Sequence, residues 1–253
     1  MDDNRQGTAL VTGASSGIGE AFARKLASQN YDLVIIARRK DRLLELAREL
    51  KSNYSISVYV IPADISTEKG IEQVEEYIKK AKNLNILINN AGFGTRGNFS
   101  DVSPEKSINM INVHVLAPTR FCRSVLPGMI KQNQGSIINV SSLAAFYPIK
   151  GNAIYKATKT YLIMFSKSIQ NELKNYNIKV QALCPGFVYT GFHDTNEFKD
   201  FDRSSVPKWL WMSAEEVVKQ SLKALRKKKV IFIPGIKNRI IAGLLKIGGK
   251  LCR

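Results

Sequence analysis

The fold is decided by the stretch "TGASSGIGEAFA", residues 12–23, which follows an apolar run at residues 8–12. Gly13, Gly17 and Gly19 separate this run from a segment whose apolar residues have helical spacing. Glycines let an anionic group approach the backbone, and the start of a helix offers that group free N–H donors. Three glycines alone are a weak signal, but between a strand and a helix they favour binding of a dinucleotide.

Apolar runs and helical periodicity alternate along the rest of the chain. Strands are expected near residues 8–12, 31–37, 56–62, 84–89, 135–141, 178–184 and 230–233. Helices are expected near residues 17–29, 40–51, 68–82, 104–130, 152–175 and 213–227. Because such alternation forms βαβ units, the sequence predicts an α/β fold with a doubly wound, parallel, seven-stranded sheet in three αβα layers. No linker rich in proline, glycine or serine is present, which favours a single domain over residues 1–253.

The composition is that of a globular protein without a metal centre. Hydrophobic residues make up 44% of the chain, which is enough to fill a sizeable core. The cysteines (Cys122, Cys184, Cys252) and histidines (His114, His193) are too few and too dispersed for a zinc site, so no metal is expected. Neither a signal-peptide pattern nor an apolar run long enough for a membrane span is present. We therefore expect a soluble, cytoplasmic protein.

The net charge of +17 is concentrated toward the C-terminus. No acidic residue follows Leu225, and the basic tail, residues 236–253, combines an apolar stripe of helical spacing with lysine and arginine. The first interpretation of this tail is docking on the protein's own core or at a subunit interface. The second is peripheral contact with an anionic membrane. Nucleic acid is not expected as a partner, because no recognition module or stacking pattern accompanies the basic residues.

Residues 190–212 follow neither the helical nor the strand period, although they lie between a predicted strand and a predicted helix. A connection of this length in a compact domain is usually functional. Its aromatic residues form too much apolar surface to remain in water. The segment is therefore interpreted as a lid over a substrate pocket.

The end of the second predicted strand, "ARRK" (37–40), bears on the choice of dinucleotide. An acidic residue at this place binds the ribose hydroxyls of NAD, whereas a guanidinium pairs with the 2′-phosphate of NADP. Arg38 and Arg39 therefore favour NADP(H) as the cofactor.

Six motifs, taken together and in order, resemble the short-chain dehydrogenase/reductase family. They are "TGASSGIG" (12–19), "ADIS" (63–66), "NNAG" (89–92), "SS" (141–142), "YKATK" (155–159) and "PGFVYT" (185–190). The resemblance extends over nearly the whole chain. It implies a Rossmann-type fold and a nicotinamide cofactor bound across the C-terminal ends of the strands.

The same resemblance implies which residues contact the cofactor. The glycine loop contributes Gly13, Ser15, Ser16, Gly17, Ile18 and Gly19. The adenine is assigned to Asp64 and Ile65, and the ribose and the floor of the site to Asn90, Ala91 and Gly92. The carboxamide and phosphates are assigned to Pro185, Gly186, Val188 and Thr190, and the nicotinamide side also to Tyr155 and Lys159.

Tyr155 and Lys159 are four residues apart and therefore share one helix face. Reduction of a carbonyl by hydride transfer needs a proton donor, and a nearby cation lowers the pKa of a phenol. The residues and the resemblance together indicate Tyr155 as general acid/base and Lys159 as the group that lowers its pKa. The family's serine precedes its tyrosine by 13 residues, which selects Ser142 to orient the carbonyl and leaves Ser141 a structural role.

A fourth catalytic position of the family, usually an asparagine on the fourth helix, aligns with His114. Asn112 precedes it by two residues and would point to another face of a regular helix. Unlike asparagine, a histidine titrates near neutral pH. His114 is the first candidate for this position, Asn112 in a locally shifted helix is the second, and a purely structural histidine is a third interpretation.

The sequence thus predicts an NADP(H)-dependent oxidoreductase that reduces a ketone or aldehyde, or oxidises the alcohol, by hydride transfer. The aromatic lid suits an apolar substrate, and a 3-oxoacyl thioester is one candidate. The alternative is a non-catalytic NADP-sensing or scaffold protein on the same fold. The resemblance further implies a homodimer or homotetramer that forms through the helices around residues 104–130 and 152–175.

Overall fold

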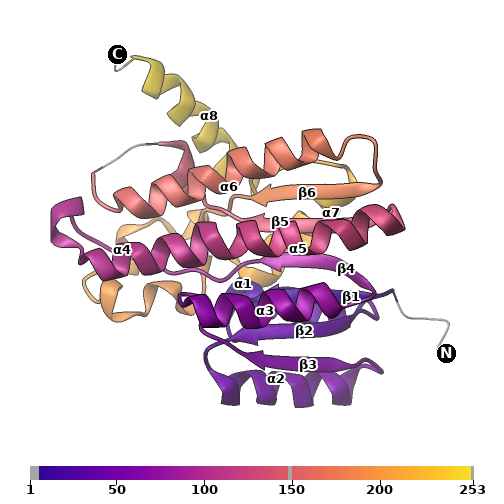
Figure 1. Ribbon diagram of the computed structural model, residues 1–253. Helices are drawn as coiled ribbons and strands as arrows, with labels where there is room; N and C mark the ends of the chain where they lie inside the picture. Colours follow the sequence, from indigo (N-terminus) through magenta and orange to yellow (C-terminus); the bar gives the residue numbers. More distant parts are fainter. Residues whose placement is uncertain (1–5, 148–149, 252–253) are drawn as a thin grey trace.

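The computed structural model describes residues 6–147 and 150–251 (Figure 1). The strands are β1 (Thr8–Thr12), β2 (Asp32–Ala37), β3 (Val58–Pro62), β4 (Leu84–Asn89), β5 (Gly135–Val140), β6 (Ile178–Leu183), β7 (Phe187–Tyr189), β8 (Trp211–Ser213) and β9 (Ile231–Phe232). Seven of them form one parallel sheet in the order β3-β2-β1-β4-β5-β6-β9. The predicted fold class is confirmed.

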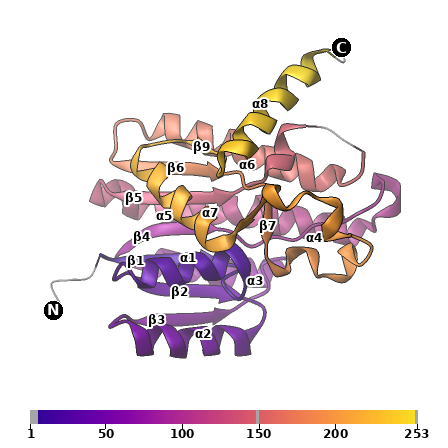
Figure 2. The same cartoon turned by 180° about the vertical axis from the view of Figure 1, so that it is seen from behind.

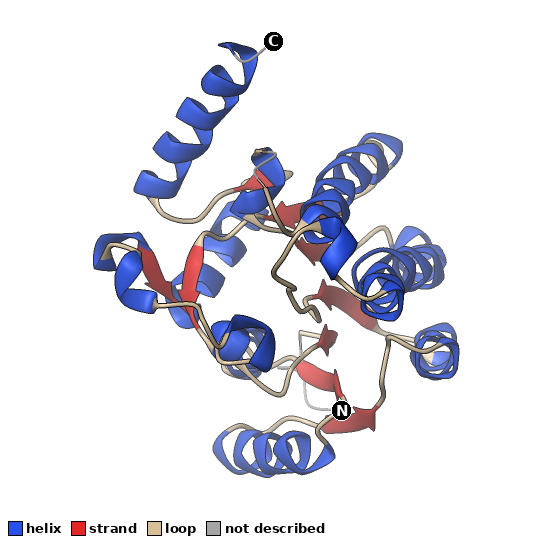
Figure 3. Ribbon diagram, turned by 90° about the vertical axis from the view of Figure 1, so that its left-hand side faces the viewer, coloured by secondary structure: helices blue, strands red, loops and turns tan. Residues whose placement is uncertain are grey.

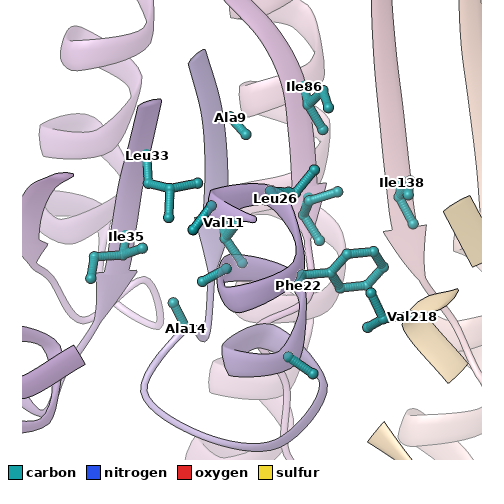
Figure 4. Packing of buried hydrophobic residues seen from close by; sticks show 14 of the residues in the cluster. Ala9, Val11, Ala14, Phe22, Leu26, Leu33, Ile35, Ile86, Ile138 and Val218 are labelled. Carbon is teal, nitrogen blue, oxygen red and sulfur yellow. The ribbon is translucent and has the colours of Figure 1, made fainter. Parts of the chain in front are cut away.

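Helices cover both faces of this sheet, which Figure 3 shows from the side. They are α1 (Gly17–Ala27), α2 (Lys40–Asn53), α3 (Glu68–Lys80), α4 (Pro104–Ile111), α5 (Ala117–Gln132), α6 (Ala153–Glu172), α7 (Ala214–Arg226) and α8 (Ile236–Leu251). The buried residues of α1, α2 and α7 belong to one core cluster, and those of α3 and α5 belong to another. The first cluster centres on α1, where Phe22 and Leu26 pack against β1 and β4 (Figure 4).

The predicted helix at 104–130 is not continuous. A π-helical turn, Asn112–Leu116, separates α4 from α5, and it ends with a bond from the Ala117 N–H to the Asn112 carbonyl. Pro118 has no N–H and cannot close a regular α-helical bond on the carbonyl four residues earlier, which accounts for the local widening. Proline at this position was the signal in the sequence that could have indicated the break.

The segment predicted as a lid contains more regular structure than expected. Its two ends pair as β7 and β8, a parallel two-stranded sheet with the register Phe187↔Trp211 and Tyr189↔Ser213. Between them the chain folds into four short 3-10 turns. The segment is therefore a long loop whose two ends are joined by the pairing of β7 with β8.

The C-terminal helix α8 projects from the body of the molecule (Figures 1 and 2). Most of the predicted basic tail lies on it, but Cys252 and Arg253 lie outside the described residues. Within the part of the chain that the structure describes, no helix combines the length and the apolar character needed to cross a bilayer.

Candidate active site at the C-terminal edge of the sheet

Two loops meet where the strand order reverses, between β1 and β4, at the C-terminal edge of the sheet. The Thr12 hydroxyl oxygen accepts hydrogen bonds from the N–H groups of Asn90 and Ala91, each at 3.0 Å. The Asn90 side-chain amide donates to the Thr12 carbonyl at 2.9 Å. A Cβ on Gly19 would lie only 2.3 Å from the Gly13 carbonyl oxygen. The glycine loop and the "NNAG" segment thus form one surface that tolerates no side chain at position 19.

Arg39 covers one end of the glycine loop. Its Nη2 donates to the hydroxyl oxygens of Ser15 at 2.9 Å and Ser16 at 2.8 Å, and Arg38 beside it is exposed. These groups lie at the start of α1, where the helix dipole is positive. The arrangement offers a guanidinium and two hydroxyls to a phosphate.

The other predicted cofactor residues divide into two groups. Thr190 reaches the glycine loop, because a Cβ on Gly17 would lie 2.9 Å from its Cγ2. The side chains of Ile65 and Val188 are instead buried in the two core clusters. The Asp64 carboxylate accepts hydrogen bonds within its own loop. The cofactor roles of these residues remain predictions.

The predicted catalytic residues come together where β5 ends and α6 begins. The Ser142 hydroxyl lies close enough to the phenol of Tyr155 to favour its ionised form. Lys159 is only 5% exposed, and its ammonium donates to the Val140 carbonyl at 2.9 Å and lies 5.7 Å from the centre of the Tyr155 ring. Ser141 points the other way and donates to the Lys159 carbonyl at 2.6 Å, so it holds α6 against β5, as expected of a structural serine.

Burial governs the pKa values of this centre. Desolvation raises the pKa of Tyr155, and the hydrogen bond with Ser142 opposes that rise only in part. The net direction of the Tyr155 pKa is upward because desolvation outweighs the stabilisation of the phenolate, and the part of Lys159 in lowering this pKa stays a prediction. Desolvation also lowers the pKa of Lys159 to about 8.

His114 lies at the centre of a buried chain of hydrogen bonds. Its Nε2 accepts from the Phe93 N–H at 3.2 Å, and its Nδ1 lies 3.0 Å from the Thr158 hydroxyl oxygen. The Thr158 hydroxyl in turn donates to the Tyr155 carbonyl at 2.9 Å. Because Nε2 accepts, the neutral ring carries its proton on Nδ1. His114 therefore joins the loop after β4 to the first turn of α6.

The environment of His114 keeps its ring neutral. Full burial, together with the nearby charge of Lys159, holds the pKa of His114 well below its usual value. The expectation that this residue titrates near neutral pH is therefore wrong. The Asn112 side-chain amide donates to the Ser66 carbonyl at 2.8 Å, and which of the two residues fills the fourth family position stays a prediction. Sequence analysis did not identify Thr158 as a link between His114 and Tyr155, because no motif marks this position.

Aromatic rings of the lid lie directly on this centre. The Phe192 ring is 6.1 Å from the Tyr155 ring and 5.4 Å from the Phe198 ring, measured between centroids. Both phenylalanines also press on Gly94, where a Cβ would lie 2.8 Å from Phe198. Sequence reasoning missed Gly94, although it stands two residues after "NNAG". Phe192 thus lies over Tyr155 in apolar contact, and the role of residues 190–212 as a lid stays a prediction.

The chain is similar to several oxidoreductases and to a relative described as inactive. The chain is 36% identical to the NADP-dependent 3-hydroxy acid dehydrogenase of Schizosaccharomyces pombe over 189 residues, 73% of each chain. It is 33% identical to the inactive hydroxysteroid dehydrogenase-like protein 1 of Homo sapiens over 192 residues, 75% of this chain but 58% of that protein. The structure superposes on a short-chain dehydrogenase from Sphingobium yanoikuyae in complex with NADPH, with a TM-score of 0.85, 31% identity and coverage of 97% of this chain and 95% of that chain. The sequence profile described as short chain dehydrogenase matches residues 7–200. With more than half of its length matched in this way, the protein belongs to the short chain dehydrogenase family.

Proposed function

We propose that the protein is an NADP(H)-dependent oxidoreductase that reduces a ketone or aldehyde, or oxidises the corresponding alcohol. The observation that carries the proposal is that the Ser142 hydroxyl acts on the Tyr155 phenol, and that the buried ammonium of Lys159 lies 5.7 Å from the centre of the Tyr155 ring. This group lies at the same edge of the sheet as the glycine loop.

The residues present fit a phosphorylated dinucleotide. The Gly13–Gly19 turn leaves the backbone open to a pyrophosphate, and Thr190 closes on it from the opposite side. Arg39, with Ser15 and Ser16, would hold a 2′-phosphate. When bound, the nicotinamide supplies or accepts the hydride.

The chain's own residues then manage the proton. The Tyr155 phenol donates its proton to the carbonyl oxygen as the alcohol forms, and the Ser142 hydroxyl orients that oxygen. Burial, which raises the pKa of Tyr155, keeps the phenol protonated and thus ready for reduction. The Lys159 ammonium then stabilises the phenolate that remains. His114 acts as a positioning residue, because it fixes the first turn of α6 through Thr158.

The substrate class follows from the lid. A carbonyl that reaches the Tyr155 hydroxyl lies against the Phe192 ring, so an apolar or aromatic ketone is favoured over a highly polar one. A 3-oxoacyl chain remains one candidate, supported by the similarity to a 3-hydroxy acid dehydrogenase.

The test is oxidation of NADPH against a panel of aliphatic, aromatic and 3-oxo ketones. Tyr155→Phe should lower kcat/KM by about 10²–10⁴-fold, because the proton donor is lost. The matched control is Tyr59→Phe, which removes the hydroxyl of a tyrosine that is 56% exposed on β3. Activity that survives Tyr155→Phe would exclude the proposed mechanism.

The choice of cofactor is tested separately. Arg39→Ala should reduce the preference for NADPH over NADH by about tenfold or more, because a charge-assisted contact contributes roughly 1.5–3 kcal/mol. Arg48→Ala, at an exposed arginine of α2, is the control. An unchanged preference for NADPH over NADH in Arg39→Ala would show that Arg38 or another residue recognises the 2′-phosphate.

The non-catalytic alternative draws support from the similarity to an inactive relative. It predicts NADPH binding without turnover of any ketone. The complete set of Ser142, Tyr155 and Lys159 favours the enzyme.

We also propose a homodimer or homotetramer formed through α4 and α6. Ile108 and Ile111 on α4 and Met164 on α6 are 57%, 41% and 60% exposed, and the two helices are in contact. The combined Ile108→Glu and Met164→Glu substitutions should lower the mass measured by light scattering. A cytoplasmic location stays a prediction.

A further inference from the structure

Helix α8 is attached to the body by one face of its first turns. Among its described side chains, Asn238 and Ala242 are buried, at 4% and 3% exposure. The Asn238 amide donates to the Pro234 carbonyl at 3.0 Å, and a Cβ on Gly186 would lie 2.8 Å from its Oδ1. These contacts fix where the helix leaves the fold and the direction in which it projects (Figure 2).

The opposite face of α8 is apolar and has no partner among the described residues. Ile236, Ile240 and Leu244 are 66%, 59% and 63% exposed. Their spacing of four residues places them in one stripe, about 200° around the helix from Asn238. Docking on the protein's own core, the first interpretation of the sequence, therefore holds for Asn238 and Ala242 but not for this stripe.

An exposed tryptophan lies beside the start of the stripe. Trp209 is 55% exposed in the last 3-10 turn of the lid, and the ammonium of Lys237 lies 5.2 Å from the centre of its ring. Tryptophan and lysine are side chains that favour the boundary between lipid and water.

The charge around the stripe indicates what covers it. Lys208, Lys237 and Arg239 are exposed next to Trp209 and Ile236, and no acidic residue follows Glu216 in the sequence. Two copies of α8 packed stripe against stripe would bring like charges together without a carboxylate to neutralise them. An anionic lipid surface supplies both the apolar phase and the opposite charge.

We propose that α8 and Trp209 form a docking surface for an anionic membrane. Ile236, Ile240 and Leu244 enter the boundary between headgroups and acyl chains, while Lys237 and Arg239 pair with lipid phosphates. The helix lies along the membrane and does not cross it. The inference is independent of the catalytic proposal.

The test is co-sedimentation of the full chain with vesicles of phosphatidylcholine, alone or mixed with phosphatidylglycerol. We expect binding to the mixed vesicles, with a strong reduction at 1 M salt, where the Debye length is about 3 Å. The double variant Ile240→Glu and Leu244→Glu should bind at least about tenfold more weakly, because two apolar side chains no longer enter the lipid. The matched control is Leu44→Glu, at a 40% exposed leucine of α2 on the far side of the molecule from α8 (Figure 1).

A second readout reports on the proposed contact itself. Trp209 fluorescence should shift to the blue when mixed vesicles are added, and Trp209→Phe should remove the shift while the buried Trp211 stays unchanged. Because all the substituted side chains are exposed, the melting temperature should not change. Three outcomes would overturn the proposal: no binding to the mixed vesicles, equal binding by the double glutamate variant, or a lower molecular mass of that variant without any vesicle binding. The last would assign the stripe to contact between copies of the chain.

Discussion

The α6 wall of the site, which carries Tyr155 and Lys159, differs from the lid over it in what holds it in place. On the α6 wall, Lys159 is bonded through its ammonium to Val140 and through its carbonyl to Ser141. His114 adds a bond to Phe93 and another to Thr158. Each of these buried polar groups has its partner in backbone or side chain, so the wall has one geometry.

The lid is held mainly by contacts between aromatic rings, some stacked and others tilted or edge-on. The ring of Phe187 lies 5.3 Å from Trp211, and that of Tyr189 lies 4.9 Å from Trp211. His193 stacks on Phe201 at 4.8 Å, and the ion pair Lys106–Glu197, at 2.7 Å, ties the lid to α4. Ring contacts are less directional than hydrogen bonds. Under the proposed function, the polar wall would determine the chemistry, and the apolar lid would determine which substrate reaches it.

The largest effect should follow from removing the charge of the α6 wall. Lys159→Met keeps the length of the side chain but leaves the phenolate without a cation. The rate of NADPH-dependent reduction should fall by about 10²–10⁴-fold. Lys167→Met, at an exposed lysine of α6, is the control. A rate within a few-fold of the wild type would show that Tyr155 works without the ammonium.

The burial of the same charge should also be visible in stability. The pKa of Lys159 is about 8 in the folded chain against a usual 10.5. Between pH 8 and pH 10.5 the ammonium is therefore protonated more fully in the unfolded chain than in the folded chain. The unfolding free energy should therefore rise with pH above pH 8, by a total of about 3 kcal/mol from this group. Urea unfolding across this window should show the rise in the wild type and its loss in Lys159→Met. Parallel curves for the two proteins would contradict the burial of the charge.

The hydrogen bonds of His114 provide a smaller test of the wall. His114→Ala leaves the Phe93 N–H without its acceptor, which should lower the unfolding free energy by about 1–3 kcal/mol. The activity should fall through kcat more than through KM, because Tyr155 loses its support through Thr158. His114→Asn retains a hydrogen-bond acceptor, so its unfolding free energy and its activity should both lie between those of the wild type and those of His114→Ala.

The pH profile separates positioning from proton transfer. If the ring is neutral, as its lowered pKa indicates, the wild-type and His114→Asn profiles should coincide around neutral pH. A wild-type inflection near neutral pH that disappears in His114→Asn would instead make His114 an acid/base group.

The predictability of the fold differs between these regions for a physical reason. The strands at 8–12 and 84–89 have the bounds that their apolar runs predict, because a buried parallel strand needs a continuous apolar segment. By contrast, β7 and β8 have three residues each, and their pairing depends on contacts between segments more than twenty positions apart. No local period can specify such a pair.

The site shows the same division. The shared helix face of Tyr155 and Lys159 was predictable from their spacing of four residues, whereas Ser142 was selected by the resemblance to the family. The catalytic roles of all three residues stay predictions. The pKa directions of Tyr155 and His114 were not predictable, because they depend on burial by elements distant in the sequence, including Phe192 of the lid.

The smallest effect should come from the lid, and it should depend on the substrate. Phe192→Ala removes the ring that packs on Tyr155, so kcat/KM for aromatic ketones should fall by about tenfold, in line with roughly 0.5–1.5 kcal/mol for an aromatic pair plus lost apolar contact. Small aliphatic ketones should be affected much less, because they do not extend to the ring. Trp209→Ala, at the exposed tryptophan of the same lid, should leave both classes unchanged. An equal loss for all ketones would place Phe192 with the α6 wall as a part that holds Tyr155, and the division of the site into chemistry and selection would then fail.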